Sequence, residues 1–190
     1  MKGRTADSAG ERTDSVQARQ AAQSFEQLFL ENWSSIYRLL VRLTGDPAEA
    51  EDLALETFSR LHQHPPKGGE DYNPGGWLYR VATNLGLRSI RSFKRREQYE
   101  MAAGKDALGE APENRPAQIF ENKEEQRLAQ LALAKMNPRR AELLVMRYSG
   151  MAYKEIAKAL HLSPTSIGPL LLRAERDFEK TYRNLVKEQP

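Results

Sequence analysis

Basic side chains recur at helical spacing between residues 77 and 96, in the segment WLYRVATNLGLRSIRSFKRR. The set comprises Arg80, Asn84, Arg88, Arg91, Lys94, Arg95 and Arg96. Steps of three or four residues place most of these side chains on one face of a helix. A cationic helix face is typical of a surface that binds a phosphate backbone. The competing interpretation is a solvated surface helix whose arginines lie along apolar neighbours, and the near absence of acids disfavours it.

This basic helix needs an apolar face that holds it against the rest of the fold. Leu78, Val81, Ala82 and Leu85 recur at the spacing of a second helical stripe. The segment therefore predicts a helix that packs inward on one side and presents charge outward on the other.

Two further helices are predicted upstream. The apolar repeat from Phe25 to Leu43 predicts a long helix that Gly45 ends. Asp46 is placed to cap the next helix, with Glu49 completing a capping box. Acidic residues mark the outer face of this second helix, namely Glu49, Asp52 and Glu56. A short turn between two such helices predicts antiparallel neighbours.

A second constellation has the spacing of a helix-turn-helix, from Tyr153 to Arg176. His161 stands at the turn, where the backbone often needs a positive φ that histidine tolerates. Ser163 is placed to cap the second helix. Early residues of that helix, Thr165 and Ser166, would reach base edges in a major groove. Arg173 and Arg176, later in the helix, would reach phosphates. The alternative is an αα-hairpin in an all-helical core, and spacing alone does not separate the two.

Composition excludes several classes of protein. The chain has 190 residues and a net charge of only +3, so its basic character is local. The absence of cysteine excludes disulfides and thiolate metal sites. No apolar run reaches the length of a membrane span, and the first residues lack a secretory signal, which predicts a cytoplasmic protein without membrane insertion. His62 and His64 with Glu56 are the best metal ligands available, and the lack of further nearby ligands disfavours a metal site. No catalytic motif and no cofactor site are predicted.

These patterns predict an all-α protein of two small helical domains. Residues 1–22 are polar and predict a disordered tail. Residues 23–98 form a three-helix bundle, and residues 119–190 form a four-helix domain that contains the helix-turn-helix. Residues 99–118, rich in glycine, proline and charge, predict a flexible linker between them.

Taken together, the segments resemble the extracytoplasmic-function sigma factors, group 4 of the sigma-70 family of bacterial RNA polymerase subunits. GDPAEAEDLALETFSRLH resembles the family's polymerase-binding helix, and WLYRVATNLGLRSIRSFKRR resembles its promoter −10 helix. MNPRRAELLVMRYSGMAYKEIAKALHLSPTSIGPLLLRAERDF resembles its domain that reads the −35 element. The order and spacing of all three segments agree with the family.

The resemblance implies a role for each surface. Polymerase-binding residues would be Glu49, Asp52, Leu53, Glu56 and Phe58, docked on the clamp helices of β′, while the flap of β is a second polymerase contact. The −10 element would be melted and held by Trp77, Arg80, Asn84, Arg88, Arg91, Lys94, Arg95 and Arg96. Asn84 is the best candidate for a base edge. Trp77 or Tyr72 would stack on a flipped base, although the large apolar area of Trp77 favours a core position. An anti-sigma factor is a further expected partner.

The sequence departs from the family pattern at Gly168-Pro169, inside the second helix of the helix-turn-helix. Proline there removes a backbone hydrogen bond to Thr165 and costs about 3 kcal/mol or a kink. Either the helix begins later than Ser163 or its surface meets something less polar than phosphate. We therefore hypothesise weaker or shifted −35 recognition. A sigma-like module that only binds an anti-sigma factor is the alternative function, which the arginine stripe disfavours.

Overall fold

The structure is a computed structural model that describes residues 7–66, 73–102 and 117–188, with side chains described for 25–66, 73–96 and 123–188. Within these ranges all regular structure is helical, which confirms the all-α prediction. The helices are α1 (Asp7–Thr44), α2 (Pro47–Gln63), α3 (Pro74–Ala102), α4 (Ala117–Lys135), α5 (Pro138–Tyr148), α6 (Tyr153–Leu160) and α7 (Pro164–Lys187).

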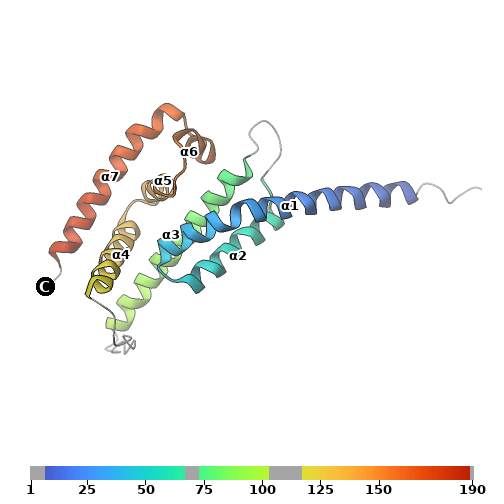
Figure 1. Ribbon diagram of the computed structural model, residues 1–190. Helices are drawn as coiled ribbons and strands as arrows, with labels where there is room; N and C mark the ends of the chain where they lie inside the picture. The colour runs from blue at the N-terminus through green and yellow to red at the C-terminus, as the bar shows by residue number, and fades with distance from the viewer. Residues whose placement is uncertain (1–6, 67–72, 103–116, 189–190) are drawn as a thin grey trace, which may run out of the picture.

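Helices α1, α2 and α3 form the N-terminal unit and lie side by side (Figure 1). Gly45 ends α1 with a positive φ of 75°, and Asp46 caps α2 by accepting hydrogen bonds from the backbone N–H groups of Ala48 and Glu49. Glu49 does not complete the predicted capping box: its carboxylate accepts a 2.8 Å hydrogen bond from Ser89 of α3. The acid thus joins two helices instead of closing one helix end.

Helices α1 and α3 approach closely at Gly86. A β-carbon at this position would lie 2.5 Å from Leu43 Cδ2, so a side chain there forces the neighbouring leucine to move. The absence of a side chain lets α3 settle against α1, and this contact orients the rest of α3.

Helices α4 to α7 form the C-terminal unit. Asn137 caps α5 through a 3.1 Å hydrogen bond from the Arg139 backbone N–H. His161 ends α6 in the left-handed conformation, with φ 54°, as the helix-turn-helix pattern predicted. Ser163 stands at the N-cap of α7, but its hydroxyl pairs with Thr165 Oγ1 and makes no capping bond.

Helix α7 starts at Pro164 and continues through Pro169. The alternative of a later helix start is therefore wrong. Pro169 itself is exposed, and Leu172 beyond it is 49% exposed. The surface of α7 beyond the proline is therefore partly apolar.

The two units share one packed core. Helix α3 contacts α4, α5 and α6, and it lies between α1 and α2 on one side and the C-terminal unit on the other (Figure 1). A single cluster of buried apolar side chains runs from Ile36 in α1 to Ala174 in α7. Gln130 of α4 also donates a 3.0 Å hydrogen bond to the Leu43 carbonyl of α1. The basic helix is therefore the central element of the molecule.

The predicted domain boundaries stay predictions. The backbone of α1 is helical from Asp7, while the side chains of residues 7–24 lie outside the described part, as does the chain before Asp7. Helix α3 continues to Ala102, past the expected boundary at residue 98, and α4 begins at Ala117. Most of the predicted linker, residues 103–116, lies outside the described residues.

Candidate nucleic-acid and polymerase interface

The basic face of α3 is only partly open to solvent. Arg80, Arg88, Arg95 and Arg96 are exposed, as the predicted outward charge requires. Asn84 is also exposed, whereas Arg91 and Lys94 are half-buried. Three members of the stripe have partners in the C-terminal unit, namely Arg80, Asn84 and Arg91.

Glu142 of α5 contacts this stripe directly. Its Oε1 accepts a 3.0 Å hydrogen bond from Asn84 Nδ2 and lies 3.7 Å from Arg80 Nε. Glu142 is buried, and burial raises the pKa of its carboxyl above the usual range, although the Arg80 charge, the Asn84 hydrogen bond and the Arg139 charge act in the opposite direction. The loss of hydration on burial therefore outweighs the stabilisation that these three partners give to the ionised carboxylate.

Arg91 is held by the end of α4. Its Nε donates a 3.3 Å hydrogen bond to the Ala134 carbonyl, in the last turn of α4, where the helix dipole favours a cation. Its Nη2 is buried without a hydrogen-bond partner among the described residues, and burial lowers the pKa of the guanidinium. A buried unpaired donor costs about 1–3 kcal/mol. The guanidinium of Arg91 is thus hydrogen-bonded through Nε, while its buried Nη2 lacks an acceptor among the described residues.

Arginines from both units line one cavity between them. The cavity has a volume of ≈ 380 Å³. Its cationic lining is Arg80 of α3, Arg139 and Arg140 of α5, and Arg173 of α7, and its floor includes Leu143 and Leu170. Arg140 is paired with Asp177 at 3.1 Å. A residue predicted to bind −10 DNA and one predicted to bind −35 DNA therefore face the same space.

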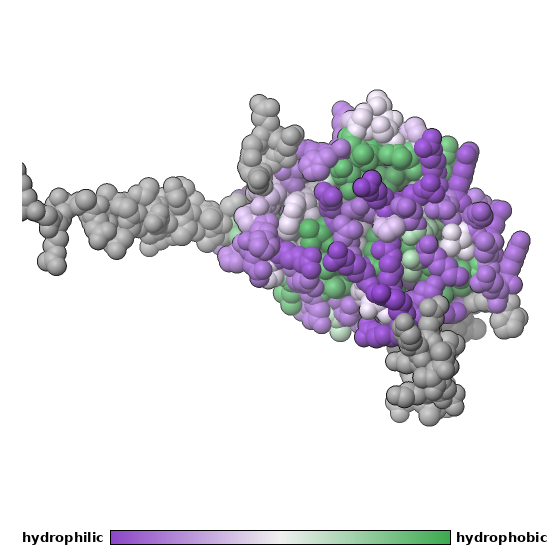
Figure 2. Space-filling model, turned by 180° about the vertical axis from the view of Figure 1, so that it is seen from behind, coloured by the Kyte–Doolittle hydropathy of each residue, from purple (hydrophilic) through white to green (hydrophobic). Residues whose placement is uncertain are grey.

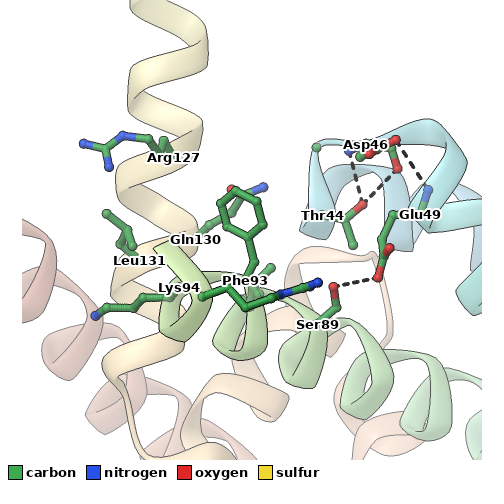
Figure 3. A pocket seen from close by; sticks show the side chains of 12 residues that line it. Thr44, Asp46, Glu49, Ser89, Phe93, Lys94, Arg127, Gln130 and Leu131 are labelled. Carbon is green, nitrogen blue, oxygen red and sulfur yellow. Dashed lines mark hydrogen bonds between the residues drawn. The ribbon is translucent and has the colours of Figure 1, made fainter. Parts of the chain in front are cut away.

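A second pocket, of ≈ 390 Å³, lies where α3 meets α4 and the turn before α2. Phe93 is 64% exposed there, and its ring points from α3 toward α4 (Figure 3). Lys94, Arg96 and Arg127 also line this pocket. Sequence reasoning missed Phe93, although an aromatic residue within a basic run is itself a signal for nucleic-acid binding.

Trp77 is half-buried and packs against the shared core. This position agrees with the core role that its large apolar area favours. Residues 67–72 of the preceding loop, Tyr72 included, lie outside the described residues.

Four of the five predicted polymerase-binding residues divide into two groups, while Glu49 is half-buried and bonded to Ser89. Asp52 and Glu56 are exposed on the outer face of α2, beside Leu55, which is 50% exposed and which the prediction omitted. Leu53 is half-buried, and Phe58 is only 2% exposed because it packs against the rings of Phe29 and Trp33. The prediction that Phe58 contacts a partner is corrected: its ring supports α2 from within, as the helical spacing of the apolar residues also indicates, and only the resemblance suggested a partner contact.

The predicted −35 residues lie on α7. Thr165, Arg173 and Arg176 are exposed, and Ser166 is half-buried. A β-carbon added at Gly168 would lie 3.9 Å from Tyr153 Cε2 of α6, which is an ordinary van der Waals distance. The helix-turn-helix thus presents three of its four predicted residues to solvent.

The C-terminal unit also carries an open apolar groove, of ≈ 740 Å³, formed by α4, α5 and α7. Its lining includes Leu133, Leu144, Tyr148, Leu172 and Phe178. Tyr148 is 70% exposed. Seen from behind, the molecule shows apolar patches framed by hydrophilic side chains (Figure 2). A groove of this size on a small domain is typical of a site for a partner segment.

Neither histidine of the α2 end is part of a metal site in the described chain. His62 packs edge-on against the Phe25 ring, with centroids 5.3 Å apart. The described residues hold no group of three or more His, Cys, Asp or Glu placed to bind a metal ion. None of the described helices is long and apolar enough to cross a membrane.

Comparisons with known proteins agree with this geometry. The model of Sigma-70 region 2 matches residues 28–97, and that of Sigma-70, region 4 matches residues 126–177. ECF RNA polymerase sigma factor SigE of Mycolicibacterium smegmatis is 32% identical over 180 residues, which is 92% of this chain and 66% of that protein. SigL of Mycobacterium tuberculosis H37Rv, also an ECF sigma factor, is 29% identical over 83% of this chain and 88% of its own.

A solved structure shows the same fold. CnrH, in its complex with the cytosolic domain of CnrY, superimposes with a TM-score of 0.52 at 19% identity, over 92% of this chain and 97% of that one. The two region models match the N-terminal and C-terminal units in the expected order. The chain belongs to the sigma-70 family, in its extracytoplasmic-function group of RNA polymerase sigma factors.

Proposed function

We propose that this chain directs core RNA polymerase to specific promoters, and that the basic face of α3 holds one strand of the opened −10 element. The exposure of Arg88, Arg95 and Arg96 along one helix carries this proposal. Phosphate contacts of this kind position a strand, while Asn84, on the same face, supplies the amide that reads a base edge. The work is binding and strand separation, without bond chemistry, in the cytoplasm of a bacterium.

Phe93 extends the proposed DNA surface. A single-stranded base presents an apolar ring face together with a charged backbone, and the pocket at Phe93 combines an exposed aromatic ring with Lys94 and Arg96. Stacking on such a ring contributes about 1–3 kcal/mol per base. We infer that Phe93 stacks on a base of the separated strand while its basic neighbours bind the flanking phosphates.

The outer face of α2 is the proposed polymerase contact. Asp52 and Glu56 offer negative charge, and Leu55 offers apolar area between them. Acidic side chains around an exposed leucine suit a basic partner surface with an apolar centre, as expected for the clamp helices of β′.

The C-terminal unit has two proposed surfaces. Thr165, Arg173 and Arg176 on α7 would contact −35 DNA. The groove formed by α4, α5 and α7 would bind an apolar segment of polymerase, the flap of β, because a helix face with apolar anchors fits such a groove.

Run-off transcription with core polymerase and a promoter pool tests the proposal. The wild-type chain should give transcripts from defined starts. Asp52→Lys places a cation against the proposed basic partner and should lower transcript yield by at least about tenfold. Glu125→Lys makes the same charge change at an exposed site on α4 and should leave the yield unchanged. Absence of specific starts with the wild-type chain would refute the proposed function.

One observation favours a second function, a module that binds an anti-sigma factor without reading promoters. Pro169 and the half-exposed Leu172 make α7 less polar than a DNA-reading helix needs to be. The same transcription assay separates the two: a module of this kind gives no defined starts, yet relieves inhibition of another sigma factor by an anti-sigma protein.

A further inference from the structure

The face of α7 proposed to contact −35 DNA has an apolar centre. Thr165, Pro169 and Arg173 are exposed and recur every four residues, so they lie along one side of the helix. The leucines beside them flank this side: Leu170 lines the cavity next to α3, and Leu172 lines the groove shared with α4 and α5. Pro169 is therefore the residue in the middle of the presented face.

This part of α7 lacks the side chains that usually read base edges. Residues 164–171 contain no side-chain amide and no guanidinium, the groups that form paired hydrogen bonds with adenine and guanine. The Thr165 hydroxyl is already paired with Ser163 Oγ at 2.7 Å, and Ser166 is half-buried. Pro169 has neither a backbone N–H nor a polar side chain. Base recognition at the centre of this face must therefore use apolar contact.

Folding gives no reason for a proline at this position. Pro169 is exposed, so its ring fills no space in the core. Inside a helix, proline removes the hydrogen bond to the carbonyl four residues earlier, here that of Thr165, and it is less favourable there than any other residue. Helix α7 nevertheless continues through it. A residue that is unfavourable for the helix and exposed on its outer face points to a role in binding.

We propose that Pro169 selects thymine in the −35 element by packing its ring against the C5-methyl group, with the Thr165 methyl as a second apolar contact. The C5-methyl group of thymine is the apolar feature that base pairs present in the major groove, and it distinguishes thymine from cytosine. The proline ring loses no rotamer freedom on binding. The inference rests on the proposed −35 contact of α7, in which Arg173 and Arg176 bind the flanking phosphates.

Replacing thymine by uracil is the direct test, because it removes the methyl group and keeps the base pair. Holoenzyme assembled from the full chain and core polymerase first selects binding sequences from random double-stranded DNA, and sequences that core polymerase alone retains are discarded. The enriched sequence is then synthesised with uracil in place of one thymine at a time, upstream of the opened segment. Burying one methyl group corresponds to about three- to fivefold in affinity, so uracil at one or two positions should weaken binding by that factor.

Pro169→Ser tests whether this residue makes the contact. Serine removes the ring and restores a backbone N–H to the helix, so the variant should be at least as stable as the wild type in thermal unfolding followed by circular dichroism. Its affinities for the thymine and uracil duplexes should agree within about 1.5-fold, because the apolar contact is gone. Pro138→Ser, at the exposed start of α5, is the matched control and should keep the difference of about three- to fivefold.

Sequence-dependent shape and stiffness of DNA can also favour thymine, and the serine variant separates this effect from contact. A thymine preference that persists in Pro169→Ser would be due to shape and would overturn the inference. Equal affinity of the wild type for every uracil duplex would overturn it as well. So would the absence of any enriched upstream sequence, which would leave the apolar face of α7 to a protein partner. The proposed function is judged separately, by defined starts in transcription, and those can be present while thymine and uracil duplexes bind alike.

Discussion

Replacing Arg88 and Arg95 with alanine removes two of the six cationic side chains that α3 offers to a single-stranded −10 element. The six are Arg80, Arg88, Arg91, Lys94, Arg95 and Arg96. Each phosphate contact on a single strand contributes about −0.7 to the slope of log affinity against log salt concentration. The wild-type slope should therefore be about −4, and the slope of the double variant about −3.

These slopes predict a clear difference over an accessible range. Between 50 and 200 mM salt, the wild-type holoenzyme should lose about 300-fold in affinity for a labelled single-stranded −10 oligonucleotide, and the variant about 50-fold. Fluorescence anisotropy at four or five salt concentrations measures both. Arg88 and Arg95 are suited to the test because both are exposed, so their loss leaves the core intact.

Lys180→Ala with Lys187→Ala is the control, since it removes two exposed cations from α7, outside the proposed −10 surface. Its slope should equal that of the wild type. A wild-type slope near zero, or a slope unaffected by the loss of Arg88 and Arg95, would show that α3 does not hold the strand through its phosphates, and the reasoning from the basic stripe would be refuted.

Three further predictions follow from burial and charge. Phe58→Ala should lower the free energy of unfolding by about 3–5 kcal/mol in urea denaturation, because it empties a buried site, whereas Phe93→Ala at a 64% exposed ring should change it by less than about 0.5 kcal/mol. Phe93→Ala should instead weaken single-strand binding by the holoenzyme by about 5- to 150-fold, with Phe93→Tyr retaining affinity, and equal affinity of the alanine variant would exclude stacking. Burial raises the pKa of Glu142 in the folded chain, so the folded state binds more protons than the unfolded state between the usual carboxyl range and the raised pKa; the free energy of unfolding should therefore fall as the pH rises through this interval, in urea denaturation at several pH values, and Glu142→Gln should remove this dependence.

Local signals in the sequence predicted the parts of the fold that depend on local chemistry. The cap at Asp46 and the left-handed turn at His161 are both set by side chains within three residues of the backbone they act on. The same reasoning overrated Ser163, whose hydroxyl has a nearby competitor in Thr165. Pro169 was expected to disturb α7, but a proline this near the start of a helix removes a single backbone bond, and α7 continues through it.

Contacts between distant segments were beyond the reach of sequence patterns. Glu49 fits a capping box by spacing, yet it accepts from Ser89, 40 residues away. The bond between Asn84 and Glu142 joins residues 58 positions apart. Helical periodicity gives the face of a helix on which a residue lies, but it contains no information on which other helix covers that face. The basic stripe was therefore predicted correctly as a helix face, while its partial cover by the C-terminal unit was not predicted.

The cover and the stripe are two consequences of one chemical property. Two donors of this central helix bind acceptors of the C-terminal unit: Asn84 donates to the carboxylate of Glu142, and Arg91 donates to the Ala134 carbonyl in the last turn of α4. The phosphates of DNA would offer the same donors acceptors of the same charged kind. The donors that suit this helix face to phosphate are therefore the same groups through which the C-terminal unit packs against it.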